Sequence, residues 1–75
     1  ELESRDEAYL VIDRLGDIIE EYGLATVADL YDLCGITTEY TDENWGWTSA
    51  RYMSVIRSRR GYMLQLPKPD HINAR

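Results

Sequence analysis

Few residues of this 75-residue chain have the types and spacings that catalysis or metal binding requires. Cys34 is its one cysteine and His71 its one histidine. A structural zinc site takes about four Cys or His ligands and a catalytic one about three, so we expect no metal. A nucleophile–base pair of Cys34 and His71 is arithmetically possible, but His71 follows two prolines in an expected tail. We therefore predict a buried thiol, an exposed imidazole and no catalytic residue.

Two acidic groups come closest to other site chemistry and fall short of it. Counted from Asp42, a calcium-binding EF-hand loop needs Gly at its sixth and Glu at its twelfth position, where this chain has Trp47 and Met53. Asp29 and Asp32 share one face of an expected helix, but paired catalytic carboxylates need a cleft and opposed environments. No glycine-rich phosphate loop occurs in the sequence. We predict that the chain is not an enzyme and takes no cofactor.

The elements that position these residues begin with a helix predicted over about residues 5–22. Ser4 is a suitable N-cap and Gly23 a left-handed stop. Gly16 lies inside the helix and costs about 1 kcal/mol relative to Ala, so we expect a close packing contact or a bend there. Apolar residues recur three and four apart and predict one buried stripe, which comprises Ala8, Val11, Ile12, Leu15, Ile18, Ile19 and Tyr22.

A second helix is predicted over about residues 27–34. Thr26 is a good N-cap, Asp29 stands at the third helical position and Gly35 ends the helix. The linker between the helices is so short that the second must pack closely on the first.

A loop over 36–49 and a β-hairpin over about 52–66 follow the helices, with one helical turn expected near Trp47–Arg51. Arg59, Arg60 and Gly61 form the hairpin turn. After Gly61, alternate residues face the core. Pro67 and Pro69 break the second strand, so we expect an extended tail over 67–75.

These elements predict the α+β class: one small domain over 1–75 with two packed helices and a C-terminal hairpin, in a winged-helix-like order. Because the chain begins with Glu1 rather than Met, we expect it to be part of a longer protein.

Charge is sorted along the sequence. Residues 1–50 carry 13 Asp or Glu against two Arg, whereas residues 51–75 carry six Arg or Lys against the single Asp70; the whole chain has a net charge of −6. A fold that returns the tail to the front half would cancel much of this charge. A fold that keeps the halves apart would present an acidic face and a basic edge.

Aromatic and basic residues of the second half form the predicted contact surface. Trp45 and Trp47 would either anchor a partner or close the end of a small core. The arginines of the hairpin would pair with the acidic first helix, with an acidic protein partner or with nucleic acid. The residues that we predict at an interface are Trp45, Trp47, Tyr52, Arg57, Arg59 and Arg60.

Three segments of this chain resemble small bacteriophage-encoded proteins of no established function. They are YGLATVADLYDLCGI at 22–36, TD with WGWT between 41 and 48, and the stretch from Arg57 through GYMLQLPKP at 61–69. The resemblance covers roughly residues 9–69 and implies a viral origin and a non-enzymatic role. It carries no assigned site residues.

We therefore expect a phage domain that binds protein, as a structural component of the virion or of its assembly, in the virion or the host cytoplasm. Its partner would be another virion protein or a second copy. Two alternatives stay open: an acidic mimic of nucleic acid that inhibits a host protein, and a winged-helix-like DNA-binding domain. The net charge and the acidic second helix disfavour nucleic acid as a partner. No apolar run reaches the roughly 20 residues of a membrane span.

Overall fold

The chain folds around an N-terminal helix that begins and ends where the capping residues predict. The computed structural model describes residues 4–72, and α1 spans Arg5–Tyr22. The Ser4 hydroxyl accepts the Glu7 N–H over 3.1 Å. Gly23 has φ 86° and donates its N–H to the Ile19 carbonyl over 2.7 Å. The helix prediction is confirmed, although Tyr22 is exposed rather than part of the buried stripe.

The second helix, α2, spans Val27–Cys34 and is also confirmed. At its start, the Asp29 carboxylate accepts the Thr26 N–H over 2.9 Å, and the Thr26 hydroxyl accepts the Asp29 N–H over 3.0 Å. At its end, Gly35 has φ 73°. The Ile36 N–H donates to the Tyr31 carbonyl over 2.8 Å, which is the Schellman pattern and holds Ile36 against the last turn.

A three-stranded antiparallel sheet lies where the sequence predicts a loop and a tail. Its strands are β1 (Ala25–Thr26), β2 (Trp45–Trp47) and β5 (Asp70–His71), in the order β1-β2-β5. The predicted loop over 36–49 also contains a 3₁₀ helix, η1 (Tyr40–Asn44), and this turn precedes Trp47 rather than following it. The loop and tail predictions are therefore wrong in these places, because strands of two or three residues are too short to show a period-two pattern.

The hairpin is confirmed. β3 spans Ser54–Arg57 and pairs antiparallel with β4, which spans Tyr62–Gln65. Along β4 the even-numbered residues are half-buried and the odd-numbered ones exposed, as the alternation predicts. The α+β class is thus confirmed as well. The winged-helix-like order is not confirmed, since η1 and β2 occupy the stretch where a recognition helix would lie.

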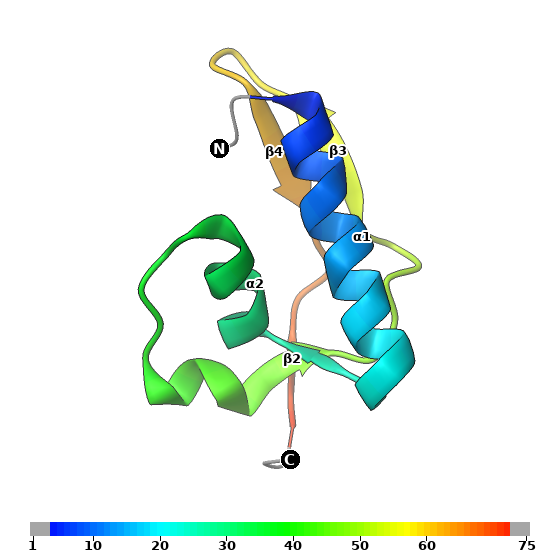
Figure 1. The fold of residues 1–75 in the computed structure, drawn as a ribbon, viewed down its shortest axis with the longest axis vertical. Coiled ribbons are helices and arrows are strands. Elements are labelled where there is room, and N and C mark those ends of the chain that lie inside the picture. The colour runs from blue at the N-terminus through cyan, green and yellow to red at the C-terminus, as the bar shows by residue number, and fades with distance from the viewer. Residues whose placement is uncertain (1–3, 73–75) are drawn as a thin grey trace.

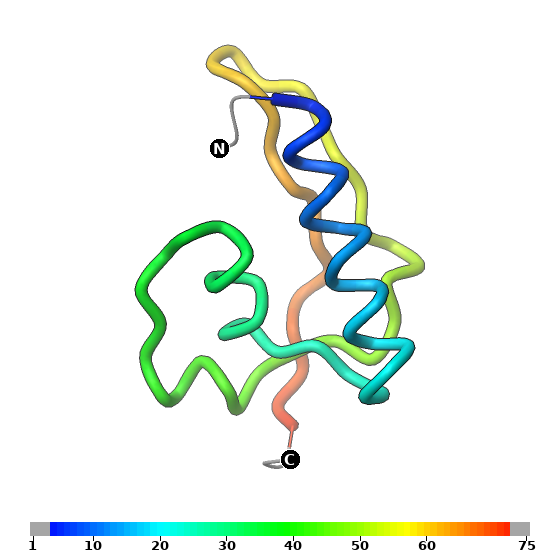
Figure 2. The backbone as a smooth tube through the Cα atoms, in the orientation of Figure 1, coloured from blue at the N-terminus to red at the C-terminus, as the bar shows by residue number. Residues whose placement is uncertain are grey.

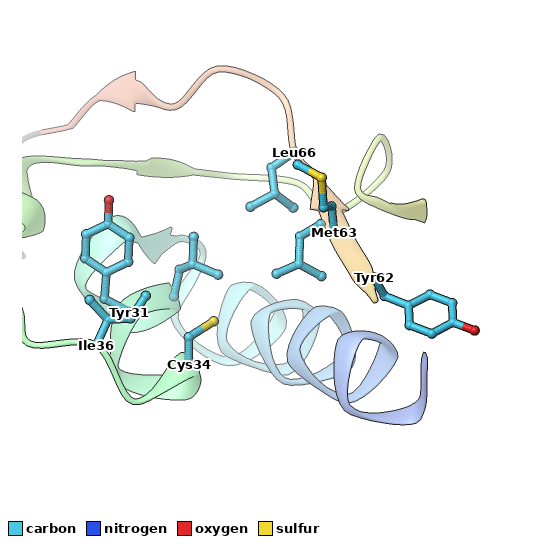
Figure 3. Close-up of a pocket in the computed structure, with 8 residues that line it drawn as sticks. Tyr31, Cys34, Ile36, Tyr62, Met63 and Leu66 are labelled. Carbon is cyan, nitrogen blue, oxygen red and sulfur yellow. The ribbon is translucent and has the colours of Figure 1, made fainter. Parts of the chain in front are cut away.

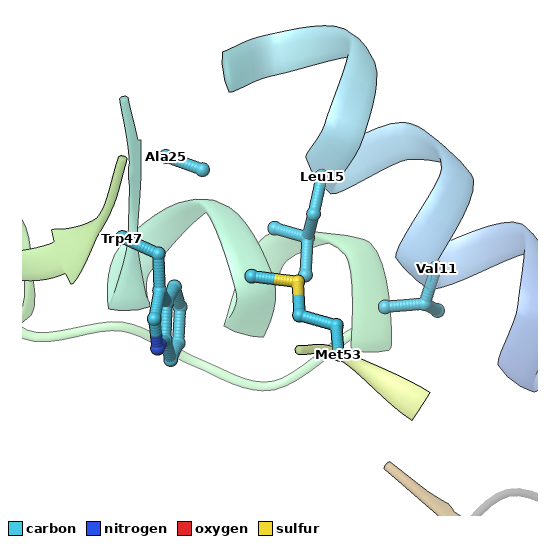
Figure 4. Packing of buried hydrophobic residues seen from close by; sticks show 5 residues of the cluster. All are labelled: Val11, Leu15, Ala25, Trp47 and Met53. Atoms are coloured by element: carbon cyan, nitrogen blue, oxygen red, sulfur yellow. The ribbon is translucent and has the colours of Figure 1, made fainter. Parts of the chain in front are cut away.

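One core joins α1 to β1, β2 and the residue before β3 (Figure 4), and Leu64 of β4 packs against it. The Trp47 side chain is only 6% exposed. Its indole N–H donates to the Pro67 carbonyl over 2.7 Å and so ties the chain after β4 to β2. The buried residues of this core are Val11, Leu15, Ala25, Trp47 and Met53.

α1 runs along the hairpin, and α2 lies to one side of both (Figure 1). The segment after β4 runs back to pair with β2 (Figure 2). The hairpin turn therefore lies at one end of a body of 36 × 24 × 18 Å, and the three-stranded sheet lies toward the other end.

Candidate functional site

An apolar groove of about 400 Å³ separates α2 from β4. Residues of α2 and the turn after it form one wall, and residues of β4 and its continuation form the other (Figure 3). The Cys34 sulfur is directed into the space between them. The lining residues are Leu30, Tyr31, Cys34, Ile36, Tyr62, Met63, Leu64 and Leu66.

Two apolar side chains at the rim of this groove are exposed to solvent. Ile36 is 52% exposed and Met63 is 42% exposed. The Schellman turn fixes Ile36, and the register of the hairpin fixes Met63 opposite Ile56. Both side chains are therefore held at the surface by local backbone structure, where a partner can cover them.

Cys34 and His71, the candidate catalytic pair, lie in different elements. Cys34 lines the groove, where burial raises the pKa of its thiol and keeps it protonated and weakly nucleophilic at neutral pH. His71 lies in β5 opposite Trp45, and the two rings meet edge to face with centroids 5.1 Å apart. His71 is exposed, as predicted, but it is part of a strand rather than of a free tail.

Two of the acidic residues considered as site candidates, Asp29 and Asp42, accept hydrogen bonds from backbone N–H groups. Asp29 belongs to the capping box of α2. The Asp42 carboxylate accepts the Glu39 N–H over 2.9 Å at the start of η1. Asp32 is exposed on α2. Over residues 4–72, no group of three or more His, Cys, Asp or Glu is arranged to hold a metal ion.

The six predicted interface residues do not form one surface. Trp47 is in the core and has little surface to offer a partner. Trp45 is partly exposed in β2, and Tyr52 is exposed in the turn before β3. The predicted arginines are exposed at or near the hairpin turn, at the end of the molecule far from β2 (Figure 1); they are Arg57, Arg59 and Arg60.

The hairpin arginines stay available to a partner. In the part of the chain that the structure describes, no ion pair joins Arg57, Arg59 or Arg60 to a carboxylate of α1. The carboxylates of α1 are likewise exposed along its outer face. The fold therefore returns the basic hairpin to the side of α1, but among the described residues its exposed arginines form no ion pair with the carboxylates of that helix.

Sequence reasoning missed the groove. Two signals pointed to it: Met63 is apolar on the face of β4 that alternation assigns to solvent, and Ile36 is apolar directly after a helix stop. Nothing in the local pattern shows that α2 and β4 lie on either side of one space.

Comparison of the chain with protein families, with curated proteins and with solved structures found no match. No helix among residues 4–72 has the length and apolar character needed to cross a membrane.

Proposed function

We propose that this chain is a non-enzymatic protein-binding domain whose contact surface is the groove between α2 and β4. The observation that carries the proposal is the exposure of Ile36 and Met63 on the rim of an apolar groove. Exposed apolar patches rimmed by polar residues mark surfaces that bind proteins or other ligands. Arg59 and Arg60 lie in the turn that precedes β4 and would favour a partner that carries negative charge.

The resemblance to phage proteins supplies the setting that we propose. In it, the partner is a protein of the virion or of its assembly, in the particle or the host cytoplasm. The groove supports binding to a protein in any setting. Absence of the chain from purified particles and from their precursors would remove the virion version only.

The experiment compares two substitutions of equal exposure on opposite strands. Met63 is 42% exposed and lines the groove, whereas its cross-strand partner Ile56 is 43% exposed and does not. The native chain, Met63→Glu and Ile56→Glu are each used to capture proteins from infected cells. We expect the native chain and Ile56→Glu to retain the same partner and Met63→Glu to lose it.

Purified partner and chain then give dissociation constants for the three forms, after circular dichroism has shown that each is folded. Met63→Glu weakens binding at least about tenfold if a desolvated contact of roughly 1.4 kcal/mol is lost. Equal affinity of all three forms, or capture of no protein by the native chain, contradicts the proposal.

A second candidate, the nucleic-acid mimic, rests on the outer face of α1. Asp13, Asp17 and Glu20 are exposed there at spacings of three and four, so their carboxylates follow one line on the surface. Competition between this chain and double-stranded DNA for a captured host protein tests this candidate. Release of the captured host protein by DNA supports mimicry. If DNA does not release the protein, the mimicry candidate is wrong.

A further inference from the structure

We infer that the groove binds its partner as an extended segment that adds a strand to the free edge of β4. This inference rests on the proposed protein-binding function and names the form of the ligand: an extended polypeptide segment, apolar at alternate residues, with Asp or Glu at the end beside the hairpin turn.

The register of the hairpin shows which backbone groups face this edge. Directly opposed residues of an antiparallel pair alternate between hydrogen-bonded and non-hydrogen-bonded pairs. The Ser58 N–H donates to the Gly61 carbonyl over 2.8 Å, so the pair of Ile56 with Met63 is the next hydrogen-bonded one. Tyr62 and Leu64 therefore direct their N–H and C=O groups away from β3.

In the described part of the chain, no strand pairs with that edge of β4. The hairpin forms a two-stranded sheet of its own. Within residues 4–72, no backbone hydrogen bond from outside the hairpin reaches Tyr62 or Leu64. Unpaired strand edges are templates for another chain. A third strand also stabilises a hairpin, which is marginal with two strands.

The same edge borders the groove. Tyr62, Leu64 and Leu66 line it from β4 and its continuation, and α2 lines it from the other side. An added strand would lie about 4.8 Å from β4, within the space that the groove provides. Every second side chain of that strand would then enter the groove between Leu30 and Leu64. Backbone pairing supplies affinity in this mode of recognition, and pockets for alternate side chains supply specificity.

Charge selects the occupant of this edge. Arg59 and Arg60 are exposed in the turn directly before Tyr62, and no carboxylate of α1 pairs with them among residues 4–72. A segment that enters the groove from that end is favoured if it carries Asp or Glu there. A second copy of the chain is disfavoured because each copy has a net charge of −6.

The first experiment selects ligands without assuming a sequence. Random eight-residue peptides displayed on a carrier are selected on the immobilised full chain. We expect the retained peptides to be apolar at alternate positions with Asp or Glu at one end. Selection on the variant that combines Arg59→Glu with Arg60→Glu should replace that acid with Lys or Arg. Retained peptides with apolar residues three and four apart would mean a helical ligand and overturn the inference.

The second experiment tests the backbone pairing itself. A selected peptide is synthesised with one backbone N-methyl group at each position in turn, which removes one hydrogen-bond donor. We expect the dissociation constant to rise at least about tenfold at alternate positions and to change little at the positions between them. Equal tolerance of N-methylation at all positions overturns the inference.

Hydrogen exchange in the complex separates this inference from the proposed function. On binding, the outward amides of Tyr62 and Leu64 should be protected more strongly than those of Met63 and Gln65, which already face β3. If a partner binds and is lost in Met63→Glu without this protection, the groove function stands and the added strand fails. If the chain forms dimers that protect the same two amides, the edge belongs to a second copy and the inference is wrong.

Discussion

Replacement of Gly46 by Ala should destabilise the protein, whereas the same replacement at Gly16 should stabilise it. A Cβ at Gly46 would overlap the Ala25 carbonyl oxygen and lie 3.0 Å from both the Ala25 carbonyl carbon and the Thr26 Cα. All three atoms are backbone, so no side chain can rotate away. A Cβ at Gly16 would meet only the Ala50 Cβ, at 3.9 Å, which is ordinary contact.

The magnitudes follow from these contacts. Overpacking costs about 1–3 kcal/mol, and we expect the upper end, about 3 kcal/mol, because β1 is held between α1 and α2. Gly16→Ala should gain about 0.5–1 kcal/mol, since Ala is the better residue inside a helix. A change of 1 kcal/mol in the free energy of unfolding shifts the melting temperature of a domain of this size by roughly 4–8 °C. The melting temperature should therefore fall for Gly46→Ala and rise for Gly16→Ala.

The assay is urea unfolding of the native chain and the two variants, followed by circular dichroism. A lower midpoint for Gly46→Ala and a higher one for Gly16→Ala is the expected result. A Gly46→Ala variant as stable as the native chain would refute the close approach of β1 and β2. A destabilised Gly16→Ala variant would refute the space between α1 and Ala50.

Three further predictions concern single side chains. Thr26→Ala should lower the free energy of unfolding by about 1–2 kcal/mol, because it removes the hydroxyl that caps α2; Thr26→Ser, which keeps that hydroxyl, should cost less in the same urea titration. Trp47→Phe should cost about 2 kcal/mol, from the lost hydrogen bond to Pro67 and part of a buried ring; it should speed exchange of the Ile72 amide, which donates to the Asn44 carbonyl, more than exchange of the Met63 amide, which faces β3. Cys34 should react with iodoacetamide more slowly in the folded chain than in urea, as mass spectrometry can measure, because burial raises the pKa of its thiol. Because the thiol pKa is higher in the folded chain, the unfolded chain loses the thiol proton at a lower pH than the folded chain does. The thiol therefore contributes to stability below its ordinary pKa, and this contribution is lost as the pH rises through the pKa of the folded chain. Cys34→Ala should lack this loss of stability at alkaline pH.

The helices could be predicted to their end residues because capping is a local interaction. Ser4 and Thr26 each cap an amide three residues along the chain, and Gly23 and Gly35 take the left-handed conformation that other residues rarely adopt. Each of these signals lies within a few residues of the structure that it specifies.

The three-stranded sheet could not be predicted in this way. β1 and β5 have two residues each, and each pairs with β2 across a long stretch of chain. Their pairing depends on tertiary contacts that no short window contains. Of the close contact or bend expected at Gly16, the close contact is not found. The glycine at which two backbones approach closely is Gly46, which the sequence shows only as a residue between two tryptophans.

The groove was harder to foresee than either sheet. Leu30 and Leu64 each match the pattern of an ordinary core residue, and only their separation in space leaves an opening between them. The predicted contact surface included the hairpin arginines beside this opening and also included Trp47, whose large ring is needed in the core.

The placement of the two tryptophans gives the protein a built-in optical probe. Trp47 contacts Pro67 and Trp45 contacts His71, so both indoles report on the return of one late segment of chain to β2. Intrinsic fluorescence will thus follow that long-range closure, whereas ellipticity will follow the helices. A delay between the fluorescence and ellipticity signals during refolding would show whether this segment pairs with β2 before or after the helices form.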